Sequence, residues 1–173
     1  MPKDAVGAEI GVFTGLFSNV IAEVCKPKQL FLVDPWNLLH GSHYPNWGAY
    51  TAHKRLPTHD AETATRARAE MMECRCDVIK AFSIEWLSSK PKESLDFVYL
   101  DAAHHFEAVL ADLQAIHRVL KPGGVILGDD AWVKSRTEMS DVYQAVTEFS
   151  TEAGFRILHL DSVGQWAISS ASQ

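Results

Sequence analysis

The sequence predicts an α/β fold in which helices cover both faces of an open, mostly parallel sheet. Short apolar runs that are typical of buried strands alternate with segments of helical character, and this alternation indicates a parallel sheet. The last two predicted strands, residues 155–160 and 165–168, surround a turn of about four residues, which is too short for a parallel crossover. They must therefore pair antiparallel, and the 173 residues suffice for one domain with a substantial core.

The first half of the chain gives two strands and two helices. Residues 6–12 form an apolar run that leads directly into glycines, and residues 15–25 then carry apolar side chains at helical spacing. The run at residues 30–33 is a strand, because the Asp-Pro pair that follows prevents its simple continuation. Residues 60–72 have the Ala, Glu and Arg content of a good helix. Residues 36–60, the cover segment, are irregular and long for a passive connection.

The second half continues the alternation. Residues 95–100 are apolar apart from Asp96 and close on an aspartate, and residues 105–119 place apolar side chains on one helical face. A Lys-Pro-Gly-Gly turn leads into the strand at residues 125–127. The remaining segments are a short strand at 78–81, a helical turn at 84–87 and a helix at 139–152 that stops at a glycine.

Composition excludes several classes of protein. Hydrophobic residues make up 47% of the chain, which excludes a disordered protein, and no apolar run approaches the roughly 20 residues of a membrane span. The net charge of −6 disfavours nucleic acid as the main partner. Cys25, Cys74 and Cys76 form neither a disulfide framework nor the usual zinc spacing, and no secretion signal is recognisable. We therefore expect a cytoplasmic protein with a small-molecule substrate and no membrane partner.

Three segments meet at one edge of the predicted sheet, namely residues 9–15 (EIGVFTG), 33–36 (VDPW) and 121–130 (KPGGVILGDD). Strand ends and helix N-termini converge there and form ligand sites in open parallel sheets. A dinucleotide loop requires a central glycine where this chain has Phe13, which disfavours a nicotinamide dehydrogenase. Glu9 suits a cationic amino group and sulfonium, and Asp34 can accept hydrogen bonds from ribose hydroxyls. The ligand inferred is S-adenosylmethionine.

These motifs, together with Leu-Asp-Ala-Ala-His at residues 100–104, resemble the class I S-adenosylmethionine-dependent methyltransferases. The resemblance covers nearly the whole chain and is greatest to the subgroup of macrocin and other antibiotic-tailoring O-methyltransferases. It implies a Rossmann-like, doubly wound sheet of seven strands in the order 3-2-1-4-5-7-6, with strand 7 antiparallel.

The resemblance also assigns cofactor-binding residues. It places the methionine end of the cofactor against Glu9, Gly11 and Gly15, the ribose against Asp34, and the adenine against Phe82 and Ser83. Asp101 is counted as a further cofactor-binding residue. Two alternatives stay open at this stage. The glycines could serve only a tight strand-to-helix turn, and Phe82 could be an ordinary core residue.

Asp101, Asp129 and Asp130 form a second group of candidate residues. Adjacent strands lie about 4.8 Å apart, so acids at two neighbouring strand ends can converge, and they repel one another unless a cation is bound. Oxygen ligands favour Mg²⁺, with Mn²⁺ or Ca²⁺ as alternatives. In the resembled subgroup these positions hold a divalent metal that binds substrate hydroxyls. The alternative is that these acids only cap helices or end strands.

Ala103 stands where several members of the resembled family have an acid that serves as general base. We expect His104 to replace it as a catalytic residue beside Asp101, since a nearby helix N-terminus would lower the pKa of its imidazole. His105 is the second candidate, and the alternative is a surface histidine.

The sequence as a whole predicts an O-methyltransferase acting on a small hydroxylated molecule, assisted by a divalent metal. The rival interpretations are a metal-free N- or O-methyltransferase and a catalytically silent cofactor-binding partner subunit. Sugar, catechol and peptide acceptors are all compatible. We expect the cover segment, which is rich in aromatic residues and histidine, to be a mobile substrate lid, the alternative being a fixed loop or the contact of a homodimer.

Overall fold

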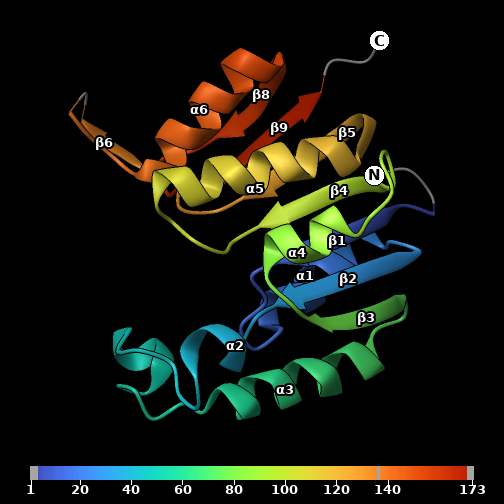
Figure 1. Cartoon of the computed structure of the whole chain (residues 1–173), viewed down its shortest axis with the longest axis vertical. Coiled ribbons are helices and arrows are strands. Elements are labelled where there is room, and N and C mark those ends of the chain that lie inside the picture. The colour runs from blue at the N-terminus through green and yellow to red at the C-terminus, as the bar shows by residue number, and fades with distance from the viewer. Residues whose placement is uncertain (1–3, 136, 171–173) are drawn as a thin grey trace.

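The computed structural model describes residues 4–135 and 137–170 and contains one large twisted sheet (Figure 1). Its strand order, β3-β2-β1-β4-β5-β9-β8, is the predicted order once a small separate hairpin, β6-β7, is set aside. The first five strands are parallel, and β9 runs antiparallel to both β5 and β8, as predicted. The strands are β1 (Val6–Ile10), β2 (Gln29–Asp34), β3 (Arg75–Lys80), β4 (Leu95–Leu100), β5 (Leu120–Gly128), β8 (Phe155–Leu160) and β9 (Trp166–Ser170).

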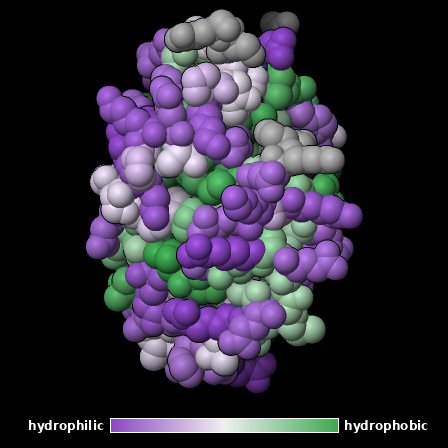
Figure 2. Space-filling view, turned by 90° about the vertical axis from the view of Figure 1, so that its right-hand side faces the viewer, coloured by the Kyte–Doolittle hydropathy of each residue, from purple (hydrophilic) through white to green (hydrophobic). Residues whose placement is uncertain are grey.

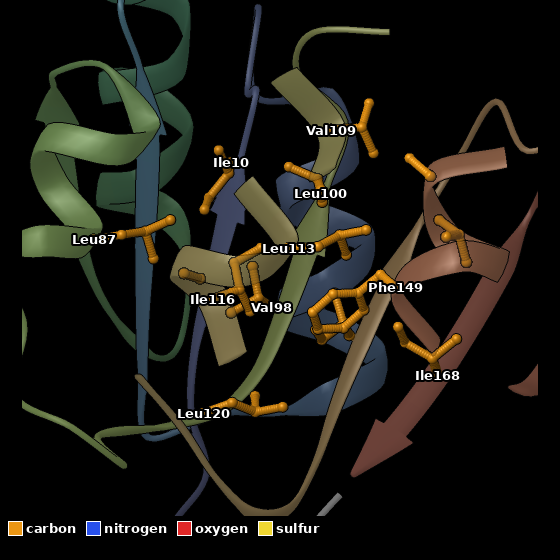
Figure 3. Close-up of a cluster of buried hydrophobic side chains, with 14 of the residues drawn as sticks. Ile10, Leu87, Val98, Leu100, Val109, Leu113, Ile116, Leu120, Phe149 and Ile168 are labelled. Atoms are coloured by element: carbon orange, nitrogen blue, oxygen red, sulfur yellow. The ribbon is translucent and has the colours of Figure 1, made fainter. Parts of the chain in front are cut away.

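Helices pack on both faces of this sheet, and each face has its own hydrophobic core. Side chains alternate along a strand, so Phe97 belongs to one core while Val98 belongs to the other. The larger core lies beneath α4 (Ser83–Ser88), α5 (Phe106–Val119) and α6 (Asp141–Ala153), with Leu113, Ile116 and Phe149 at its centre (Figure 3). The second core lies beneath α1 (Leu16–Cys25) and α3 (Thr58–Met71). Each fully buried Leu, Ile or Phe contributes about 1.5–3 kcal/mol to folding.

The carboxyl ends of the parallel strands meet at one edge of the sheet, on the left in Figure 1. Gly11 follows β1 there with a φ of +87°, and a Cβ atom at this position would lie 1.7 Å from the carbonyl oxygen of Asp101. The ends of β1 and β4 therefore approach so closely that only glycine fits. The opposite edge, at the amino ends of the strands, is largely hydrophilic with smaller hydrophobic areas (Figure 2).

Several predicted boundaries were wrong. Strand β3 begins at Arg75, three residues before the predicted start at 78, because polar residues interrupt the apolar pattern of this half-exposed edge strand. The cover segment is not wholly irregular: it contains α2 (Asn37–His40) and a 3₁₀ turn, η1 (Gly48–Thr51), and α3 begins within it, at Thr58. The small hairpin of β6 (Val133–Ser135) and β7 (Glu138–Met139) was not predicted, so α6 begins at Asp141.

Within residues 4–135 and 137–170, no helix is both long enough and apolar enough to cross a membrane.

Candidate active site

The turn between β1 and α1, residues 11–15, is here called the glycine loop. The Asp34 carboxylate at the end of β2 accepts hydrogen bonds from the backbone N–H groups of Val12 and Phe13, at 2.9 Å each. It also accepts the N–H of Trp36 at 2.7 Å. A carboxylate offers about four lone-pair sites, so these hydrogen bonds use three of them, and the contact of Asp34 with a ribose hydroxyl stays a prediction. Burial raises the pKa of Asp34, and these three hydrogen bonds oppose that rise.

The carbonyl groups of the glycine loop accept hydrogen bonds from side chains elsewhere in the chain. The oxygen of Phe13 accepts hydrogen bonds from Trp36 Nε1 at 2.8 Å and from Thr65 Oγ1 at 3.3 Å, and Arg68 donates to the oxygen of Thr14 at 2.9 Å. Sequence reasoning missed Thr65 and Arg68, because nothing in the composition of α3 indicates which of its polar side chains reach a loop about fifty residues earlier. It also counted Trp36 among the cover aromatics, whereas this side chain is completely buried.

Glu9 lies in β1 beneath the glycine loop, where only 1% of its surface is exposed. Its Oε2 accepts a hydrogen bond from the hydroxyl of Ser18 in α1. Burial raises the pKa of Glu9 to about 8, so the carboxyl group is mostly protonated at neutral pH. A cationic group placed beside it would favour its ionised form.

Asp101, His104 and Asp130 come together at the ends of β4 and β5, with one ligand atom of each within 4.8 Å of the others. His104 Nε2 lies 3.4 Å from Asp101 Oδ1 and 3.2 Å from Asp130 Oδ2. Asp129, a predicted metal ligand, is instead turned so that its Oδ1 accepts the backbone N–H of Asp130 at 2.7 Å. The structure thus brings together two of the three predicted metal ligands and the predicted base.

The expected direction of the His104 pKa was wrong. Helix α5 begins at Phe106 with His105 as its N-cap residue, so His104 is near a helix N-terminus as predicted. However, the hydrogen bond to Asp101 and the charge of Asp130 raise the pKa of His104. Two carboxylates in direct contact outweigh the partial charge of one helix end.

The cover segment lies against the glycine loop through aromatic contacts. The rings of Phe13 and Tyr50 stack with centroids 4.6 Å apart, and Tyr44 meets the Phe13 ring edge-on at 4.9 Å. Beside them is a cavity of about 520 Å³ lined by His40, His43, Tyr44, Pro45 and Lys54. The buried hydroxyl of Tyr44 has no hydrogen-bond partner among the described residues. The segment therefore packs against the glycine loop, while its role as a mobile substrate lid stays a prediction.

Phe82 and Ser83, the predicted adenine residues, lie where β3 leads into α4. Phe82 is the N-cap residue of α4 and is 43% exposed, which excludes the alternative of an ordinary core residue. Its contact with adenine stays a prediction, as does that of the half-buried Ser83.

The sheet order, the glycine loop and the acidic strand ends define the Rossmann-like fold of class I methyltransferases. The chain belongs to a methyltransferase domain family, whose sequence model matches residues 8–131. No curated protein sequence matches the chain.

Solved structures share the fold at low sequence identity. An S-adenosylmethionine-dependent methyltransferase from Aquifex aeolicus is 14% identical, with a TM-score of 0.60 over 96% of this chain and 81% of its own. The 1,6-didemethyltoxoflavin-N1-methyltransferase of Burkholderia thailandensis, solved with S-adenosylhomocysteine, is 13% identical, with a TM-score of 0.62 over 99% of this chain and 72% of its own. The [4+2]-cyclase SpnF is 12% identical, with a TM-score of 0.67 over 100% of this chain and 77% of its own. These likenesses concern the fold alone.

Proposed function

We propose that this protein transfers the methyl group of S-adenosylmethionine to a hydroxyl group of a small molecule, with help from a divalent cation. One observation carries the proposal: in a methyltransferase domain, the glycine loop and the cluster of Asp101, His104 and Asp130 lie at the same sheet edge. In-line attack on a sulfonium methyl group needs an oxygen held close to that carbon and the loss of its proton. The arrangement supplies candidate residues for both requirements.

The cofactor would bind over the glycine loop. In this proposal the ammonium group of its methionine part lies near Glu9, and the remaining acceptor site of Asp34 takes a ribose hydroxyl. The adenine lies near Phe82 and Ser83, at the end of β3. Gly11 and Gly15 would form the loop beneath the cofactor, although the close approach of Asp101 to Gly11 and of Thr65 to Gly15 also requires these glycines.

The donor set at the ends of β4 and β5 fits a hard divalent ion such as Mg²⁺. Asp101 and Asp130 would hold the ion, and Asp129 is the neighbouring acid that a side-chain rotation could add. When bound, the ion would lower the pKa of the acceptor hydroxyl and orient it. His104, between these acids, would accept the proton of the hydroxyl. The contacts of His104 with Asp101 and Asp130 also support the alternative of a metal-free enzyme. The positive charge of a protonated His104 can itself balance the negative charges of these carboxylates.

The acceptor would be a small molecule with a ring and polar groups, held under the cover segment. The cavity beside Tyr44 combines aromatic surface with basic and hydroxyl groups, which suits such a molecule. O-methylation in the manner of the antibiotic-tailoring subgroup is the form of the reaction we favour. The cyclase among the structural neighbours shows that the fold also carries other reactions, so methyl transfer must be measured directly.

The test is a screen of hydroxylated metabolites with methyl-labelled S-adenosylmethionine, followed by mass spectrometry. We expect label in at least one acceptor, transferred with the formation of S-adenosylhomocysteine. A parallel screen of amines tests N-methylation. Tight cofactor binding without transfer to any acceptor would contradict the proposal and favour a catalytically silent partner subunit.

A further inference from the structure

Three sulfur atoms meet at the amino end of β3, where α3 leads into the edge of the sheet. Cys76 Sγ lies 3.2 Å from Met72 Sδ and 3.5 Å from Cys74 Sγ. The three side chains are half-buried, whereas the residues that alternate with them along the chain are exposed. Methionine and cysteine therefore share one face of an extended segment, and that face points inward.

The convergence is closer than the backbone alone requires. Residues two apart in an extended chain are separated by roughly 6.8 Å, about twice the distance between these sulfur atoms. The side chains of Cys74 and Cys76 pack against the second hydrophobic core, as do those of Cys25 and Ala69. The sulfur atoms therefore form a compact group of soft donors against an apolar wall. Burial, with the neighbouring Cys74 thiol, raises the pKa of Cys76, so this thiol keeps its proton unless a cation replaces it.

We propose that Met72, Cys74 and Cys76 form a binding site for a single Cu(I) ion. Two thiolates and one thioether are ligands that select soft Cu(I) over hard ions such as Mg²⁺. Structural zinc usually takes four ligands, one more than this group supplies. Binding involves no oxidation or reduction: two Cu–thiolate bonds and one Cu–thioether bond form, and the two thiol protons are released to solvent.

The site is independent of methyl transfer. It lies at the start of β3, whereas the glycine loop and the acidic cluster lie at the carboxyl edge of the sheet. Met72 is the C-cap residue of α3, so a bound ion would join the end of this helix to the first residues of the strand. We expect the ion to stabilise this connection, since a ligand that binds only the folded state raises the free energy of unfolding.

The test is an anaerobic titration of the reduced full chain with Cu(I) in competition with a coloured Cu(I) chelator. We expect one tightly bound ion per chain, two protons released, and an X-ray absorption spectrum with only sulfur in the first shell. Cys74→Ser and Cys76→Ser should each weaken Cu(I) binding at least about 10-fold, the lower end of what even an outer-shell change costs. Met72→Leu should also weaken it.

Two variants serve as matched controls. Met71→Leu alters the adjacent methionine, which is 85% exposed, and Cys25→Ser alters the remaining thiol, and both should leave Cu(I) affinity unchanged. Circular dichroism of every variant checks that it is folded. Equal affinity in the folded Cys74→Ser and Cys76→Ser variants, nitrogen or oxygen in the first shell, or chelator that retains all the Cu(I) would overturn the proposal. None of these results bears on the methyltransferase activity.

Discussion

The indole Nε1 of Trp36 donates a hydrogen bond to the carbonyl oxygen of Phe13, at 2.8 Å. Trp36 is the first residue of the cover segment, and Phe13 is the centre of the glycine loop. The Trp36 backbone N–H also donates to Asp34, which binds the same loop from its N–H side. Trp36 has an unusual φ of +39°, so these contacts hold it in a conformation that non-glycine residues seldom adopt. One buried side chain thus joins the cover segment to the proposed cofactor loop.

Trp36→Phe should weaken both the fold and cofactor binding. An aromatic ring is kept, but the oxygen of Phe13 loses its shorter hydrogen bond and keeps only that from Thr65, and one such hydrogen bond contributes about 0.5–1.5 kcal/mol. Urea unfolding measures the stability, and titration with S-adenosylhomocysteine measures the binding. Trp47→Phe, which alters an exposed tryptophan of the same segment, is the control and should change neither. Equal behaviour of the two variants would show that the hydrogen bond does not position the loop.

S-adenosylmethionine and S-adenosylhomocysteine should each raise the melting temperature. A ligand at 100 times its dissociation constant adds about 2.7 kcal/mol to the free energy of unfolding. Asp34→Ala should abolish most of this shift, because it removes the carboxylate that orders the glycine loop and the proposed ribose acceptor. Differential scanning fluorimetry at saturating cofactor measures the effect. A wild-type protein that shows no shift with either compound would remove the methyltransferase proposal.

The stability of the cofactor-free protein should contain a pH-dependent contribution from Glu9. Burial raises its pKa from 4.5 to about 8 in the folded state. Between these values the folded state keeps a proton that the unfolded state has lost, so stability falls as pH rises through this window. Glu9→Gln should remove this contribution. The free energy of unfolding should therefore change differently with pH in the two proteins within this window, and in the same way below pH 4.5. Urea unfolding at several pH values across the window measures the free energy of unfolding of both proteins. The same pH dependence in both would contradict the argument that burial raises the pKa of Glu9.

Removal of divalent metal should abolish methyl transfer, and added Mg²⁺ should restore it. Asp101→Asn and Asp130→Asn should reduce the metal-dependent rate strongly, because each removes a proposed oxygen ligand and its charge. Glu107→Gln, at an exposed position in the first turn of α5, is the control and should keep the wild-type rate. The measurement is turnover of labelled cofactor with an identified acceptor. Full activity in excess chelator would instead support the metal-free alternative.

His104→Gln should lower turnover by about 10²-fold or more while cofactor binding stays intact, because the acceptor hydroxyl loses its proposed general base. His105→Gln tests the second candidate at the adjoining N-cap position and should have little effect. Single-turnover kinetics and a parallel cofactor titration separate chemistry from binding. If the two variants behave in reverse, His105 is the base. If neither slows the reaction, neither His104 nor His105 takes the proton.

The sequence by itself determined the alternation of strands and helices and the antiparallel pairing of the last two strands, whereas the strand order came from the resemblance to the class I methyltransferases. Apolar periodicity and loop length are local properties, so the alternation of strands and helices can be read without knowing any tertiary contact. The same holds for the candidate residues at the strand ends, because Gly11, Asp34 and Asp101 each follow directly where an apolar run ends, and Asp129 and Asp130 follow Gly128 at the end of another.

Only the tertiary structure decided which side chains meet at that edge. Asp129 and Asp130 are neighbours in sequence, and a backbone φ of +66° at Asp130 accompanies the arrangement in which Asp130, and not Asp129, faces His104. Thr65 and Trp36 reach the same carbonyl oxygen from different elements. Such side-chain contacts depend on how separate helices and strands pack and on the backbone angles of the residues that follow a strand. Local patterns of polar and apolar residues do not encode either of these.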